Sequence, residues 1–100
     1  MISIRFYFGN HLAADWLAAR LATVVGGATV IDTLGMWYDS DNAVLLREPG
    51  AVVEVIGSPD DIELAVWKGL AQDAAGRYGE RAVLWTVTHL IDSGTVKAAA

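Results

Sequence analysis

The stretch Ile2–Val25, ISIRFYFGNHLAADWLAARLATVV, changes its hydrophobic period at Gly9–Asn10. Before this point, large apolar residues alternate with Ser3, Arg5 and Tyr7, which is the pattern of a half-buried strand. Asn10 is a favoured helix cap, and the apolar residues after it recur at helical spacing. The stretch therefore predicts a strand and then a helix over His11–Val25. The core-facing stripe of that helix is expected to be Leu12, Trp16, Leu17, Leu21 and Val24.

The middle of the chain predicts two more strands. Ala28–Tyr38 is rich in β-branched and aromatic residues, and Asp39–Asn42 is typical of a turn. Ala43–Arg47 continues as extended chain, Glu48–Pro49–Gly50 is expected to interrupt it, and Ala51–Ile56 is the third main strand. Because proline cannot donate a ladder hydrogen bond, Pro49 is expected at a bulge or an edge.

A second helix and a fourth strand complete the pattern. Ser58 is suited to cap this helix, with Pro59 at its first position and two aspartates in its first turn. Its expected core stripe is Leu64, Trp67, Ala71, Ala74 and Tyr78, with Gly79 ending the helix. Arg81–Ile91 reads as the last strand.

The order β-α-β-β-α-β predicts an α+β, ferredoxin-like fold, with a four-stranded antiparallel sheet and two helices on one face. Right-handed crossovers place the first and third strands in the middle. We expect one domain over residues 1–91 and a tail over 92–100, of which Ala98–Ala100 are left out of the fold.

Composition excludes several classes of function. The net charge is −5, and the seven basic residues are scattered, which argues against nucleic acid and anionic membranes as partners. The chain has no cysteine, so disulfides and thiolate chemistry are excluded. No secretory signal or membrane span is visible, and a cytoplasmic location is expected.

No metal or cofactor is predicted. Asp39–Asn42 resembles the opening of a calcium loop, but Val44 stands where glycine is needed and Gly50 where glutamate is needed. The two histidines, His11 and His89, have no spacing that supports a zinc site. No serine lies in a nucleophile elbow, so no catalytic residue is assigned.

The last strand is partly apolar on both faces, which suggests that a second copy of the chain covers the face without helices. We therefore expect a homo-oligomer, with a dimer as the first guess. The candidate interface residues are Ile62, Val66, Leu84 and Leu90. Scattered surface apolar residues are the simpler alternative.

The same face carries polar residues that suggest a small pocket. Its candidate lining is Arg5, Tyr7, Trp37, Glu54, Thr86, Thr88 and His89, which would suit an anionic or aromatic small molecule. Arg5 and Glu54 can pair across neighbouring strands, and the alternative to a ligand site is an ion pair that fixes strand register.

Phe8–Gly9, Trp16, Thr29–Asp32, Gly35 with Trp37, and Arg47–Pro49 resemble a family of uncharacterised small bacterial proteins with a domain of unknown function. The match covers about half the chain. Met36 departs from the polar residue of that family, and the first connection is shorter here. The resemblance implies a ferredoxin-like fold and assigns no activity or catalytic residue.

Three functions remain open. The first is a non-enzymatic binding or interaction module that works as a homo-oligomer. The second is a viral or mobile-element inhibitor of a host defence complex, similar to anti-CRISPR proteins, which would occlude a basic groove with acidic residues. Its candidate surface is Asp39, Asp41, Asp60, Asp61 and Glu63. The third is a cofactor-free enzyme of the dimeric α+β barrel type, which rests on fold analogy alone.

Overall fold

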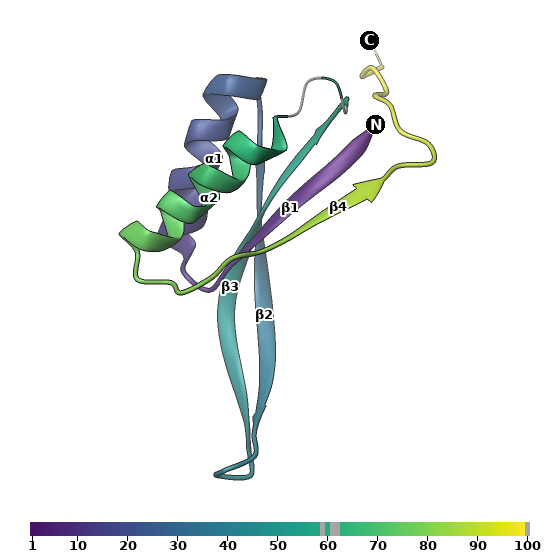
Figure 1. Cartoon of the computed structure of the whole chain (residues 1–100). Coiled ribbons are helices and arrows are strands. Elements are labelled where there is room, and N and C mark those ends of the chain that lie inside the picture. The colour runs from purple at the N-terminus through teal and green to yellow at the C-terminus, as the bar shows by residue number, and fades with distance from the viewer. Residues whose placement is uncertain (59, 61–62, 100) are drawn as a thin grey trace.

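The computed structural model describes residues 1–58, 60 and 63–99. The elements are β1 (Ile2–Phe8), α1 (His11–Val25), β2 (Thr29–Asp39), β3 (Val44–Gly57), α2 (Leu64–Arg77) and β4 (Leu84–His89). The four strands form one antiparallel sheet in the order β2-β3-β1-β4, and both helices cover the same face (Figure 1). This is the ferredoxin-like α+β fold that the sequence predicts, with β1 and β3 in the middle.

The core lies between the helices and one face of the sheet. It takes Ile4, Phe6 and Phe8 from β1, with Val53 and Val55 from β3. The core residues of α1 are Ala13, Ala14, Leu17 and Leu21. The expected stripe of α1 is therefore wrong at two positions, because Leu12 and Val24 are mostly exposed. Two alanines take the central places, since small side chains let the helix approach the sheet closely.

Helix α1 begins and ends as the sequence predicts. The Asn10 side chain accepts a hydrogen bond from the Leu12 N–H at 2.8 Å. Gly26 ends the helix in the left-handed region, at a φ of 89°, and its N–H donates to the Ala22 carbonyl. Both ends thus satisfy backbone groups that a helix leaves without partners.

Helix α2 begins later than the sequence predicts. Its first residue is Leu64, after Glu63, whose side chain makes no capping hydrogen bond. Ser58 instead accepts a hydrogen bond from the Asp60 N–H at 3.4 Å, which closes a separate turn before the helix. A serine side chain can accept a backbone hydrogen bond in a turn as well as at a helix cap, so Ser58 marks a turn here and not the start of the helix. Pro59 and Asp61 lie outside the described residues. The core stripe is confirmed, with Trp67, Ala71 and Ala74 buried and Leu64 and Tyr78 packed against the core.

Strands β2 and β3 extend far beyond the rest of the sheet (Figure 1). Strand β1 ends at Phe8, which pairs with Ala51, whereas β2 and β3 remain paired to Asp39 and Val44. We call residues 33–50 the hairpin arm. The arm gives the molecule its longest dimension of 54 Å, against 30 and 25 Å in the other directions.

Glu48–Pro49–Gly50 does not interrupt β3, which corrects the sequence prediction. Pro49 pairs with Leu34 in a continuous ladder. Strand β3 has only one neighbour here, so the edge position expected for Pro49 is confirmed, and its missing N–H leaves no second ladder incomplete. At the arm's tip, Asp39 accepts hydrogen bonds from Asp41 and Asn42, which confirms the turn.

The last strand is shorter than predicted, since β4 covers Leu84–His89 rather than Arg81–Ile91. Residues 90–99 contain no helix or strand. Within the described part of the chain, no helix is long and apolar enough to cross a membrane.

Candidate functional site

The face of the sheet opposite the helices, here called the open face, carries a polar cluster at its centre. Strand register places Arg5 beside Glu54 on one side and Thr86 on the other. The cluster lines a shallow cavity of about 420 Å³. Its lining residues are Ser3, Arg5, Tyr7, Glu54, Ile56, Thr86, Thr88 and Leu90. The structure thus brings together five of the seven residues proposed from the sequence.

Arg5 and Glu54 form the predicted ion pair. The Nε of Arg5 donates to Oε2 of Glu54 at 2.6 Å, and the Ser3 hydroxyl donates to the same oxygen at 3.0 Å. The carboxylate of Glu54, and then the hydroxyl of Tyr7, raise the pKa of Arg5 above its ordinary value. The Glu54 side chain is only 15% exposed. Since Glu54 already has two donors, this pair fixes the register of β1 and β3.

A second cavity lies where the hairpin arm leaves the sheet, with a volume of about 390 Å³. Its polar and aromatic lining comes from Tyr7, Thr33, Trp37 and Glu48. A side chain at Gly35 would meet the Trp37 indole at 3.5 Å, so the indole lies over this glycine. No cation in the described residues lies within salt-bridge distance of Glu48. We call this cavity the arm-base cavity.

Sequence reasoning missed the arm-base cavity, because it treated Glu48–Pro49–Gly50 only as an interruption of the strand. It assigned Trp37 to the same pocket as Arg5, whereas the structure places Trp37 in the arm-base cavity. Tyr7 lines both cavities and separates them. Strands β2 and β3 are longer than β1. This difference in strand length is the signal that could have revealed the arm-base cavity.

His89 is the second correction to the proposed pocket. It pairs with Ile2, so it belongs to the helix-facing side of the sheet and lines neither cavity. His11 lies in the first turn of α1, with its Nε2 at 2.8 Å from Oδ1 of Asp32. The described residues contain no group of three metal-ligating side chains.

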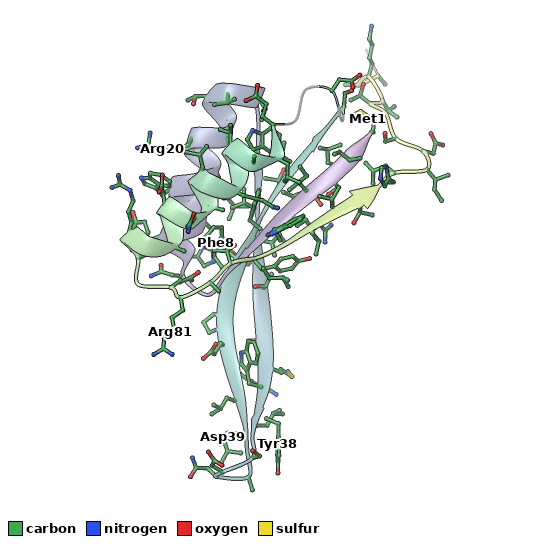
Figure 2. All side chains as sticks on the ribbon, in the orientation of Figure 1. Met1, Phe8, Arg20, Tyr38, Asp39 and Arg81 are labelled. Carbon is green, nitrogen blue, oxygen red and sulfur yellow. The ribbon has the colours of Figure 1, made fainter. Side chains whose placement is uncertain are left out.

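Large apolar side chains of the hairpin arm are exposed on both of its faces (Figure 2). Trp37 and Leu46 lie on the open-face side, where they pair with each other, with exposed fractions of 60% and 43%. The opposite side carries Leu34, Met36, Tyr38 and Leu45, which are each more than half exposed. No other element of the described chain covers this surface.

The candidate interface residues that the structure describes do not form one patch. Leu84 is exposed on the open face, and Leu90 lines the cavity beside it. Val66 is exposed on α2, which covers the other face of the sheet. Ile62 lies outside the described residues.

The candidate acidic surface also divides into separate parts. Asp39 and Asp41 lie at the tip of the hairpin arm, whereas Asp60 and Glu63 lie in the β3–α2 connection at the other end of the molecule (Figures 1 and 2). Asp61 lies outside the described residues. Hydrogen bonds from Asn42, mainly from its side chain, lower the pKa of Asp39 below its ordinary value, in keeping with a role in the turn.

No protein family and no curated protein matches the chain in sequence comparisons. Solved structures share its fold. A CutA protein from Pyrococcus horikoshii superimposes with a TM-score of 0.64 at 10% identity, over 94% of this chain and 88% of that chain. The divalent cation tolerance protein CutA from Archaeoglobus fulgidus gives 0.60 at 8% identity, over 93% and 87%. A phage SAM lyase, solved with S-methyl-5'-thioadenosine, gives 0.59 at 16% identity, over 87% and 79%. At these identities the comparisons establish a ferredoxin-like fold shared with CutA proteins and a phage lyase.

Proposed function

We propose that the chain is a small binding module that works as a homo-oligomer, with the hairpin arm as the principal contact between copies. The observation that carries the proposal is the apolar surface on both faces of the arm, which no element of the described chain covers. A strand pair that is apolar on both sides is unfavourable in water and is typical of an interface. The arm also projects from the fold, so it can reach across a neighbouring copy.

The energetics are adequate for a stable assembly. Six arm side chains are 43% to 68% exposed, and covering each fully removes about half of its area from water. At about 1.5–3 kcal/mol for a complete side chain, this amounts to roughly 5–9 kcal/mol for each arm. Association costs on the order of 4–15 kcal/mol, so at least two arms must be buried together. A symmetric assembly meets this requirement because every copy contributes its own arm.

Native mass spectrometry and light scattering test this proposal. We expect an oligomer for the unchanged chain and dissociation for Leu46→Glu, which puts a charge in the centre of the arm. Val66→Glu is the matched control, because Val66 is similarly exposed, at 53%, but lies on α2. A monomeric unchanged chain would refute the proposal. If only Val66→Glu dissociates the oligomer, the interface lies on the helical side of the sheet and not on the arm.

A second candidate function is binding or cleavage of S-adenosylmethionine in the arm-base cavity. Tyr7 and Trp37 offer aromatic faces for a purine, and Glu48 offers a carboxylate to a sulfonium cation. The structural likeness to a phage SAM lyase supports the candidate. The cavity is partly open, so a neighbouring copy held by the arm would enclose it further.

Calorimetry with S-adenosylmethionine and S-methyl-5'-thioadenosine tests this candidate, together with chromatography for the second compound as a product. If Glu48 recognises the sulfonium, Glu48→Gln weakens the cationic ligand at least tenfold and leaves the neutral thioether nearly unchanged. Glu63→Gln is a control of the same chemistry outside the cavity. An equal loss of affinity for both ligands would show that Glu48 does not recognise the sulfonium. No binding of either ligand would reject the candidate function.

The acidic inhibitor is not favoured by the geometry, because the four of its proposed residues that the structure describes lie at two distant places rather than on one surface. An electrostatic block of a basic groove needs a contiguous field. The oligomeric module accounts for the exposed apolar arm, which the inhibitor hypothesis leaves unexplained.

A further inference from the structure

A third cavity lies on the helical side of the sheet, between α2 and β4, and belongs to neither surface discussed above. Its volume is about 440 Å³. Phe6 contributes to its lining from the sheet, Ala71 and Ala75 from α2, and Val83 and Trp85 from the chain at β4. Three charged residues, Lys68, Glu80 and Arg81, also line it, and Lys68 and Glu80 have unused hydrogen-bonding capacity.

Glu80 is held in place but only half satisfied. Its Oε1 accepts a hydrogen bond from the Asn10 N–H, and its own N–H donates to the Ala75 carbonyl at 2.9 Å. Its Oε2 is buried and has no partner among the described residues. A buried carboxylate oxygen without a donor is unfavourable, and native structures supply such donors from protein, water or ligand. Glu80 is therefore a fixed carboxylate at the cavity whose second oxygen lacks a donor.

Lys68 provides the complementary charge. Its ammonium group lies 3.9 Å from the centre of the Trp85 ring, which holds a cation by its π face. No carboxylate in the described residues lies within salt-bridge distance of it. An ammonium group has three donors, so contact with the ring leaves capacity for an anion.

The two charges lie at different places along the cavity. Lys68 is in the second turn of α2, whereas Glu80 follows the helix end. Lys68 and Gly76, both in the lining, are eight positions apart, which corresponds to about 12 Å along the helix. The lining between them comes from Ala71, Gln72 and Ala75. The ligand that matches is elongated, with an ammonium group at one end and a carboxylate at the other.

We propose that this cavity binds a small elongated zwitterion, with its ammonium group on Glu80, its carboxylate on Lys68 and its body against Phe6 and the α2 alanines. A peptide of three residues has a suitable length, since an extended chain covers about 3.3–3.6 Å for each residue. Arg81 also lines the cavity, and we assign it no contact with the ligand.

Trialanine is the probe, and calorimetry on the full chain is the measurement. We expect one site for each chain, with binding at least tenfold weaker for N-acetyl-trialanine, for trialanine amide and for free alanine. The first two remove one charge each, and the third keeps both charges but cannot span the cavity. Equal binding of the free and blocked peptides, or no binding of trialanine at millimolar concentration, would overturn the proposal.

Two variants assign the ends of the ligand. Glu80→Gln keeps an oxygen for Asn10 and should weaken trialanine at least tenfold while leaving the weak binding of N-acetyl-trialanine unchanged. Lys68→Met should likewise weaken trialanine at least tenfold while leaving the weak binding of trialanine amide unchanged. Asp73→Asn, on an exposed part of α2, is the control. If circular dichroism shows that Glu80→Gln is unfolded, Lys68→Met and the blocked peptides decide. These variants leave the hairpin arm unchanged. The number of subunits therefore tests the proposed oligomer separately from the binding of the peptide.

Discussion

Replacing Gly50 by alanine tests how tightly the arm is joined to the sheet. A Cβ built at Gly50 would lie 2.6 Å from the carbonyl oxygen of Phe8 and 3.1 Å from the Thr33 hydroxyl. The closer atom belongs to the backbone of a paired strand, so it cannot rotate away as a flexible side chain can. The end of β1 must therefore separate from β3, or the arm must change its angle.

The expected loss is about 1–3 kcal/mol for overpacking, offset by about 0.4–1 kcal/mol because alanine restricts the unfolded chain. A net loss of about 1–2 kcal/mol lowers the melting temperature by roughly 4–16 °C in a chain of this size. Thermal and urea unfolding followed by circular dichroism measure this, at one protomer concentration because assembly shifts apparent stability.

Gly69→Ala is the matched control, because nothing lies within 4 Å of its added Cβ and the residue is inside α2. Alanine favours the helix there by about 0.8–1.0 kcal/mol. The two substitutions should thus shift stability in opposite directions. A Gly50→Ala chain as stable as the unchanged protein would refute the close approach of Phe8, and so would equal shifts for both variants.

Two further predictions concern helix and turn chemistry. Asn10→Ala should destabilise the fold by about 0.5–2 kcal/mol in urea unfolding, because it removes the acceptor for the Leu12 N–H, and Asn10→Ser should restore most of the loss. The pKa of Asp39, followed by NMR, should lie below its ordinary value of 3.8 and rise in Asn42→Ala, which removes the side-chain donor. Since this pKa is lower in the folded chain, its contribution to stability is present above pH 3.8 and is lost as pH falls through the folded value. An unchanged pKa in Asn42→Ala would contradict this account.

The sequence predicted features that short-range chemistry determines. The change of hydrophobic period at Gly9–Asn10 places β1 and α1 correctly, because burial on one face is written directly into residue spacing. The Arg5–Glu54 pair followed from strand order alone. Once β1 and β3 are neighbours, the alternation of faces restricts which charges can meet.

Features that depend on contacts far apart in the chain were not predictable in this way. Glu48–Pro49–Gly50 has the composition of a break, but a strand with one neighbour tolerates proline, and only the tertiary structure shows where β1 ends. The start signal at Ser58 marked a turn because local hydrogen bonds cannot distinguish a turn from a helix end. The position of Glu80 beside its cavity depends on a hydrogen bond from Asn10, which lies 70 residues earlier.

Three glutamates differ in what their surroundings leave them free to do. Glu54 receives two donors on one oxygen and so serves the sheet. Glu48 lines the arm-base cavity and has no salt-bridge partner in the described residues. In the absence of a bound cation, water can hydrogen-bond to its carboxylate. Glu80 is the most constrained, because burial removes solvent from Oε2 while Asn10 fixes the other oxygen. An acceptor that is buried, fixed and unsatisfied gains most from a ligand, because orientation has already been established before binding. Glu80 is therefore expected to discriminate between charged and blocked ligands more sharply than Glu48.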